Sequence, residues 1–171
     1  FLVASRPHIS LPYGVRLRGD MVSQYLNRKI RNKLLIAHDV SMAGNQRWDT
    51  ISAICDGLDV MFATTKIDPD TGKPLFAHVS SHAHTLTGYW ASELVGRDPK
   101  VLHAYATNTE EARKFMKTLA KTGHAETRLI NRRKNGDLYG CHIIACSAPG
   151  QDAQKPIFFA FLADCAIGEC V

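Results

Sequence analysis

The chain has 171 residues, of which 45% are hydrophobic and 22% charged, so it can bury a core of its own and is not of the disordered class. Its formal net charge is +5, and all of this excess lies in residues 1–50, which hold eight Lys or Arg and three Asp or Glu. The balanced remainder lacks the basic character of a nucleic-acid-binding domain. No apolar run reaches the about 20 residues that a membrane-spanning helix needs.

Residues 1–50 are predicted to form a basic N-terminal extension. Residues 1–14 contain two prolines and a glycine, which indicates an irregular lead-in. Residues 17–37 then follow a helical apolar pattern surrounded by basic side chains. We expect this helix to pack on the domain or to form a homodimer, whereas binding to an acidic membrane or nucleic-acid surface is the alternative. Its apolar face comprises Leu17, Met21, Val22, Tyr25, Leu26, Ile30 and Leu34.

The five cysteines form no C-x-x-C pair and are odd in number, so no disulfide framework is expected. Free cysteines are often small buried core residues, which suits a reducing intracellular compartment, cytoplasmic or nuclear. The start of the chain lacks both a signal peptide and an initiator Met, which favours a fragment of a larger protein.

Short elements are predicted between residues 47 and 96. A helical pattern covers residues 47–57, and two strands follow at 58–67 and 75–79, with a turn at 68–73. Gly88 and Gly96 then bound an apolar segment long enough for one or two helical turns.

An amphipathic helix is predicted over residues 110–122. Asn108 is its expected N-cap, Glu111 its capping-box partner and Gly123 its C′ residue. Two strands follow, and Asn135-Gly136 predicts a type I′ turn between them, so the segment is typical of an α+β domain. The apolar stripe of the helix is Ala112, Phe115, Met116 and Leu119.

The motifs TGY (87–89), ELVGR (93–97) and NRRKNG (131–136), in this order around an amphipathic helix, resemble the PAS domains. Within that family they are most similar to the flavin-binding LOV branch, over about residues 57–166. The resemblance implies a PAS fold at residues 51–171, with a five-stranded antiparallel sheet flanked by short helices after the N-terminal helical extension.

The segment that carries LOV photochemistry differs from the family pattern. The family's GRNCRFLQ stretch corresponds to GRDPKVLH at residues 96–103. Pro99 takes the place of the photoreactive cysteine, and because proline has no thiol, no cysteinyl–flavin adduct is expected there. Asp98 replaces a flavin-contacting Asn, Lys100 a phosphate-pairing Arg and His103 a Gln.

Three further positions follow from the resemblance. Asn131 matches the first flavin-contacting Asn of the hairpin, whereas Cys141 and Leu162 replace a second Asn and a Gln. Each unpaired buried polar group of a flavin would cost about 1–3 kcal/mol, so flavin is not expected to bind. The candidate pocket positions are Asp98, His103, Asn131, Cys141 and Leu162, and the strand faces expected to look inward are Thr127–Leu129–Asn131, Cys141–Ile143–Ala145 and Phe158–Ala160–Leu162.

These inward faces are mostly apolar, so they form either a filled core or a small cavity for an apolar ligand. Some PAS domains bind haem through a histidine, for which His103 is the best placed, while His142 has the parity of the opposite face. His78, His82 and His84 fit no strong metal pattern. No nucleophile or phosphate-binding motif indicates an enzyme.

The sequence therefore predicts a sensory or interaction module of a larger signalling protein, which binds a small apolar ligand or a protein partner and acts on an output domain. A ligand-free dimerisation domain and a haem sensor are the alternatives, with an enzyme of PAS-like fold as a more distant one.

Overall fold

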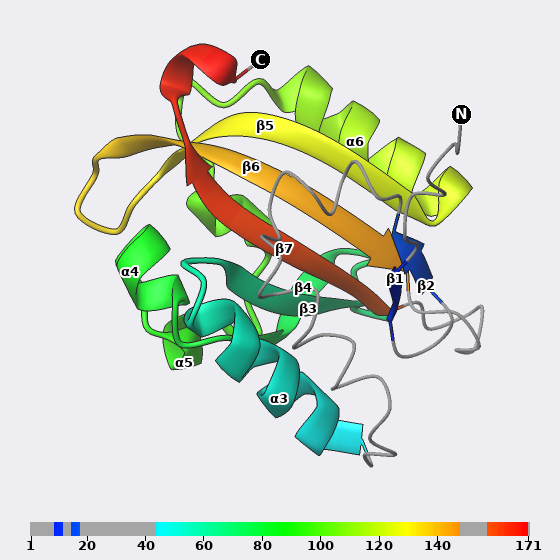
Figure 1. Cartoon of the computed structure of the whole chain (residues 1–171). Coiled ribbons are helices and arrows are strands. Elements are labelled where there is room, and N and C mark those ends of the chain that lie inside the picture. Colours follow the sequence, from blue (N-terminus) through cyan, green and yellow to red (C-terminus); the bar gives the residue numbers. More distant parts are fainter. Residues whose placement is uncertain (1–8, 12–14, 18–43, 148–156, 171) are drawn as a thin grey trace, which may run out of the picture.

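The computed structural model describes residues 9–11, 15–17, 44–147 and 157–170. Its centre is a five-stranded antiparallel sheet in the order β4-β3-β7-β6-β5 (Figure 1). The five strands are β3 (Met61–Ile67), β4 (Pro74–Val79), β5 (His124–Arg132), β6 (Leu138–Ser147) and β7 (Ile157–Cys165). The five-stranded antiparallel sheet implied by the resemblance is confirmed.

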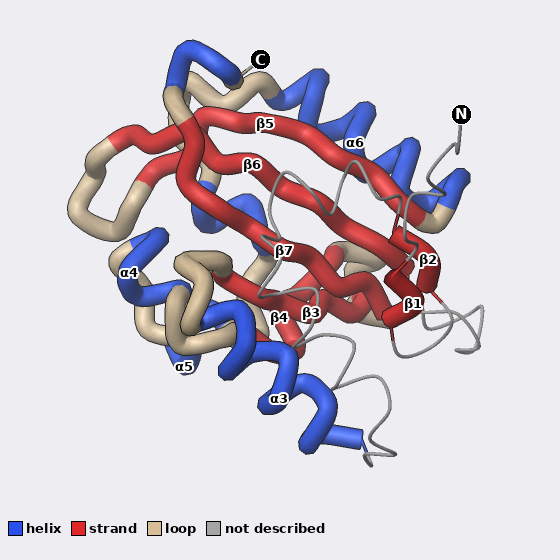
Figure 2. The backbone as a smooth tube through the Cα atoms, viewed as in Figure 1, coloured by secondary structure: helices blue, strands red, loops and turns tan. Residues whose placement is uncertain are grey.

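Helices occupy the chain before the sheet and the crossover between β4 and β5. The first is α3 (Gly44–Asp56), and the crossover holds α4 (Ala83–Thr87), α5 (Ala91–Leu94), the 3-10 helix η1 (Pro99–Leu102) and α6 (Thr109–Thr122). A final 3-10 helix, η2 (Ile167–Glu169), follows β7. Figure 2 shows α4 and α5 beside the β3–β4 half of the sheet, and α6 along β5. No helix in the described ranges is long and apolar enough to cross a membrane.

The N-terminal predictions are partly corrected. Ile9–Leu11 (β1) and Val15–Leu17 (β2) pair as antiparallel strands, so residues 1–14 are not irregular throughout, and Leu17 does not begin a helix. The rest of the predicted amphipathic helix lies outside the described residues, as does its apolar face. The proposed division at residue 50 stays a prediction, and α3 runs across it.

Both faces of the sheet are covered, because alternate residues of the central strands point to opposite layers. One face packs against α3 through Phe62, Cys146, Phe159 and Phe161. The opposite face, called the inner face here, packs against α4, α5 and η1 through a cluster that includes Met61, Leu86, Leu94, Leu102, Cys141 and Leu162. Farther along this inner face, Leu119 of α6 packs on Ala125, Ala145 and Phe158. The inner-face layer is where the candidate site lies.

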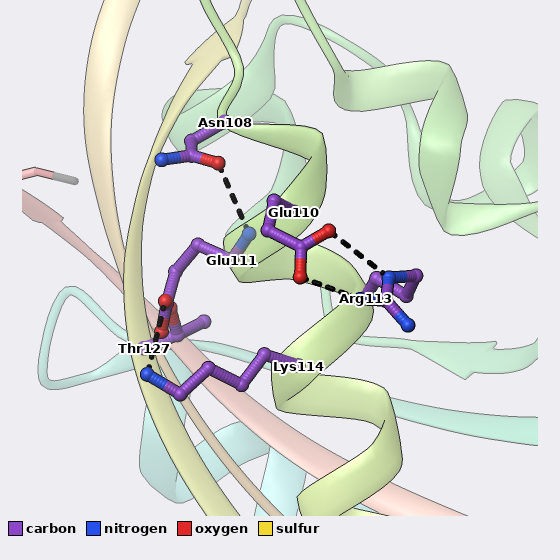
Figure 3. A network of polar contacts seen from close by, with 6 residues as sticks. All are labelled: Asn108, Glu110, Glu111, Arg113, Lys114 and Thr127. Atoms are coloured by element: carbon purple, nitrogen blue, oxygen red, sulfur yellow. Dashed lines mark hydrogen bonds and ion pairs between the residues drawn. The ribbon is translucent and has the colours of Figure 1, made fainter.

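Helix α6 has the predicted N-cap, Asn108, but it lacks the predicted capping box. The Asn108 Oδ1 atom accepts a hydrogen bond from the Glu111 backbone N–H at 3.0 Å, and Gly123 ends the helix with φ +77°. The Glu111 carboxylate does not complete a capping box, because it lies against the Thr127 hydroxyl at 3.5 Å and Lys114 at 3.6 Å (Figure 3). Glu111 thus connects α6 to β5. The apolar stripe is confirmed only in part, since Met116 is exposed.

The turn between β5 and β6 is not the predicted type I′ turn. That turn needs positive φ at both central residues, but of Asn135 and Gly136 only Gly136 has one, at +99°. The Gly136 N–H bonds to the Arg133 carbonyl at 3.0 Å, and the Arg133 N–H bonds to the Asp137 carbonyl at 2.8 Å. The loop is therefore three residues long, with a left-handed glycine at its end.

Candidate functional site

The inner-face layer contains two buried polar side chains from neighbouring strands. Asn131 on β5 is 2% exposed and Tyr139 on β6 is 3% exposed, and the two residues are directly paired across the strands. Among the described residues, neither the Asn131 Oδ1 atom nor the Tyr139 hydroxyl has a hydrogen-bond partner. Buried polar atoms are nearly always paired, so two such atoms side by side require an explanation.

The surroundings of Tyr139 keep its hydroxyl protonated. Burial raises the pKa of Tyr139 well above its usual value, and the neighbouring Cys141 adds to this effect. The Asn131 amide opposes part of the rise in the Tyr139 pKa, although the two side chains do not form a hydrogen bond in this structure. The pair can therefore offer an amide oxygen as acceptor and a neutral hydroxyl as donor.

His103 lies beside Asn131. The two residues form an isolated antiparallel β-bridge, which attaches the segment after η1 to the end of β5. The Thr107 hydroxyl strengthens this attachment by donating to the Ile130 carbonyl at 2.5 Å and accepting from the Ala104 N–H at 2.7 Å. Burial, and then the positive charge of Lys100, lower the pKa of the half-buried His103. Both effects favour the neutral form of the imidazole.

Cys141 and Leu162 belong to the apolar part of the same layer. Cys141 is 0% exposed and Leu162 is 5% exposed, and both lie in one cluster with Tyr139. Burial raises the pKa of the Cys141 thiol far above its usual value, so this cysteine is a neutral apolar side chain. Asp98 is placed differently, because its carboxylate caps η1 by accepting the Lys100 N–H at 2.9 Å.

The structure therefore brings together four of the five predicted positions, Asn131, His103, Cys141 and Leu162, while Asp98 holds the helix that precedes His103. The three predicted inward strand faces are buried or partly buried. His142 lies on the opposite face, as its parity indicates, and bonds to Glu126 at 2.5 Å.

Tyr139 and Arg133 are site residues that the sequence reasoning missed. Strand alternation was a sufficient signal for Tyr139, since it has the same parity as Cys141. The Arg133 guanidinium lies 4.4 Å from the centre of the Tyr139 ring, donates to the Leu86 carbonyl and pairs with Asp164 at 3.2 Å. Arg133 covers the ring from the hairpin side, and no sequence pattern indicated this role.

Two of the histidines in residues 78–84, His78 and His84, take part in separate side-chain contacts. His78 lies 2.7 Å from the Ser52 hydroxyl of α3, and His84 stacks on Trp90 with ring centres 3.8 Å apart. The Ser52–His78 contact pairs a hydroxyl with a base, but among the described residues no carboxylate bonds to His78, and Phe62 lies against its ring. We interpret this contact as a link between α3 and the sheet.

Solved structures share this fold. The LOV domain from the Erythrobacter litoralis EL346 blue-light activated histidine kinase is 22% identical, covering 61% of this chain and 96% of its own, with a TM-score of 0.54. A light-oxygen-voltage domain studied with a flavin analogue is 20% identical, covering 73% and 90%, with a TM-score of 0.59. The PAS domain of a protein from Colwellia psychrerythraea is 14% identical, covering 70% and 97%, with a TM-score of 0.57.

The sequence itself matches no protein-family model and no curated protein. At these identities the structural likeness establishes the fold alone. The binding properties of this chain must be inferred from its own residues.

Proposed function

We propose that this chain, which has the PAS fold and is similar in structure to LOV domains, is a sensory module of an intracellular signalling protein. It binds a small, mostly apolar molecule that carries one polar group, and it relays the occupancy of the site to another part of the protein. The similar domain from Erythrobacter litoralis belongs to a histidine kinase, which supports a place in a larger signalling chain.

The observation that carries this proposal is the unpartnered pair of Asn131 and Tyr139. Leaving a buried polar atom without a hydrogen bond costs about 1–3 kcal/mol. A ligand with a donor and an acceptor on one edge would satisfy the Asn131 oxygen and the Tyr139 hydroxyl together. The apolar residues around the pair, which include Leu102 and Leu162, suit the remainder of such a ligand.

A flavin does not fit this set of residues. An isoalloxazine ring has several amide-like groups that need partners, yet Cys141 and Leu162 are buried in an apolar cluster, and the Asp98 carboxylate is turned to the backbone of η1. The adduct chemistry of LOV domains is not proposed either, because Pro99, which has no thiol, begins η1 at the corresponding position.

The test compares Tyr139→Phe with the native protein before and after bound small molecules are removed by unfolding and refolding. Without ligand, Tyr139→Phe should be more stable by about 1–3 kcal/mol, since it deletes an unpaired buried hydroxyl. With ligand, the advantage should shrink or reverse, because the hydroxyl is then paired. Thr127→Val is the matched control, as Thr127 is equally buried on the inner face but already contacts Glu111.

The ligand itself is sought by mass spectrometry of the supernatant after heat denaturation, together with a visible spectrum of the purified protein. A small molecule whose rebinding is weakened by Tyr139→Phe or Asn131→Leu supports the proposal. A flavin-like spectrum or a Soret band would contradict the proposed ligand class, the latter directing attention to His103. Recovery of no molecule, with equal stability changes before and after refolding, would leave a ligand-free module.

We further propose that the protein acts as a homodimer through the apolar face that contains Val22, Leu26 and Ile30, which lie outside the described residues. Leu26→Asp should then give a monomer by analytical ultracentrifugation. An unchanged sedimentation profile would disprove this mode of association.

A further inference from the structure

Two neighbouring thiols lie at the end of the last strand and in the segment that follows it. Cys165 is the final residue of β7, and Cys170 follows η2; their Sγ atoms lie 3.8 Å apart. Both are free and partly exposed, whereas Cys55, Cys141 and Cys146 are buried. This contrast separates one accessible pair from three inaccessible thiols.

We propose that Cys165 and Cys170 form a reversible redox site, which low-molecular-weight disulfides such as oxidised glutathione convert to an intramolecular disulfide. The site is distinct from the Asn131–Tyr139 pair, and it does not depend on a ligand there.

The backbone around Cys165 gives the pair one fixed member. Cys165 pairs with Gly140 of β6, and the contact is so close that a Cβ on Gly140 would lie 2.5 Å from the Cys165 carbonyl oxygen. Cys165 is thereby held directly against the sheet. Burial and the nearby Cys170 raise the pKa of the Cys165 thiol to about 12, which lowers the reactivity of this thiol.

The segment that carries Cys170 is less restrained. Ala166, Ile167, Gly168 and Glu169 are all exposed, and a Cβ on Gly168 would meet nothing within 4 Å. The contact between Glu169 and Arg128, at 3.7 Å, is an ion pair in which Glu169 is exposed and Arg128 partly exposed, so solvent screens much of its attraction. The turn can therefore adjust to bring the two sulfur atoms from contact distance to bonding distance, about 2.05 Å.

The reaction consists of two thiol–disulfide exchanges. The Cys170 thiol loses its proton, and the thiolate attacks one sulfur of oxidised glutathione, forming a mixed disulfide and releasing one reduced glutathione. The Cys165 thiol then loses its proton and attacks the Cys170 sulfur, forming the Cys165–Cys170 bond and expelling the second reduced glutathione. Two protein thiols are oxidised, one disulfide is reduced, and each released glutathione thiolate takes up one proton.

The second step is favoured once the first has occurred. Burial is the largest cause of the rise in the Cys165 pKa, and the other causes include a hydrogen bond to Cys170 and the negative charge of the Cys170 thiolate. In the mixed disulfide the Cys170 sulfur carries neither a proton nor a charge. The Cys165 thiol then ionises more readily beside the sulfur that it attacks. Closure would fix residues 166–170 covalently to the end of β7.

The experiment treats the reduced, folded chain with oxidised glutathione, blocks remaining thiols with N-ethylmaleimide after denaturation, and digests with a protease that cleaves after glutamate and aspartate. Cleavage after Asp152, Asp164 and Glu169 places Cys141, Cys165 and Cys170 on three separate peptides, so the Cys165–Cys170 disulfide appears as two peptides linked together. We expect this linked species to account for the loss of both thiols, with dithiothreitol restoring them. The other three cysteines should be recovered with N-ethylmaleimide attached.

Two variants define the controls. Cys165→Ser should stop at a glutathione adduct on Cys170, because no second thiol attacks it. Cys141→Ser should leave the Cys165–Cys170 link intact, which excludes Cys141 as the partner, although Cys165 is near enough to help raise the pKa of Cys141. A stable glutathione adduct on Cys170 in the native chain, or a link between Cys141 and Cys165, would overturn the proposal. Both of these contradicting outcomes are measured on the native protein, so the test does not depend on a variant that folds.

Discussion

Gly140 and Cys165 lie in contact along their backbones, at the point where β6 passes the end of β7. An ideal Cβ on Gly140 would be 2.5 Å from the Cys165 carbonyl oxygen and 2.9 Å from that of Ala166. Real Cβ atoms do not approach backbone oxygens so closely, and backbone atoms cannot turn away as a side chain can. The position therefore requires glycine for space.

Gly140→Ala should destabilise the protein by about 1–3 kcal/mol, the usual cost of forcing an extra group into a packed site. The measurement is the free energy of unfolding from urea denaturation. Gly168→Ala is the matched control, because it adds the same methyl group to the neighbouring turn where nothing lies within 4 Å. Equal effects of both substitutions would show that the close approach at Gly140 is unimportant.

Asn108→Ala should weaken the start of α6. It removes the acceptor of the Glu111 N–H, and loss of an N-cap costs about 0.5–2 kcal/mol. Asn108→Asp retains a capping oxygen and should retain most of the stability. Urea denaturation followed by circular dichroism measures both variants. The Glu111 side chain bonds to Thr127 instead of the N-cap backbone. Glu111→Gln should therefore destabilise the helix less than the same substitution would if Glu111 completed a capping box.

The stability of the protein should fall on acidification through His103. Its pKa is lowered in the folded state from the ordinary 6.5, mainly by burial, so the unfolded chain binds its proton first. The contribution of His103 is therefore complete above about pH 6.5 and is lost as the pH falls through the folded-state value. His103→Gln should flatten this part of the stability profile, as measured by urea denaturation at a series of pH values.

The neighbours of His103 provide a second measurement, the NMR titration of its ring protons. Lys100→Gln should raise the His103 pKa, because the positive charge of Lys100 lowers it. Asp98→Asn should lower the pKa further, since the Asp98 carboxylate opposes the other effects, and an amide oxygen can still cap η1. Shifts in the opposite directions would contradict this arrangement of charges.

Arg133→Lys should destabilise the protein by about 1.5–3 kcal/mol, the range for hydrogen bonds that involve a charged group. The guanidinium contacts the Leu86 carbonyl, Asp164 and the Tyr139 ring at once, and a lysine ammonium cannot reproduce this planar geometry. Arg132→Lys is the control on the same hairpin, where the side chain is exposed. Thermal unfolding of the two variants measures the difference, and equal melting temperatures would contradict the role of Arg133.

The sequence predicted the features that depend on local rules. Asn108 and Gly123 cap α6 because capping needs only the neighbouring backbone, and alternation placed Thr127, Leu129 and Asn131 on one buried face. The type I′ turn was wrong because the Asn-Gly pair also fits a three-residue loop in which only Gly136 has positive φ.

The long-range contacts of the site could not be predicted. The resemblance to LOV domains identified Asn131 and His103 as separate candidate pocket positions. Nothing in the sequence indicates that their backbones form a bridge. The contact of Arg133 with Leu86 likewise joins residues 47 positions apart. The Glu111 carboxylate was expected to bond to the Asn108 backbone N–H, but it contacts the Thr127 hydroxyl of β5 instead. A contact between distant residues thus replaced the local capping box.

The position of β7 in the sheet has a consequence for folding. The β3–β4 and β5–β6 hairpins can each form from neighbouring residues, but β7 lies between β3 and β6 and pairs with both. β6 and β7 are consecutive in the chain, but the pairing of β7 with β3 closes a long loop, which slows folding. Until residues 157–165 arrive, β3 and β6 each keep an unpaired edge that is open to association with other chains. We therefore expect slow, cooperative folding in which the two halves of the sheet become one unit only when the final strand is inserted.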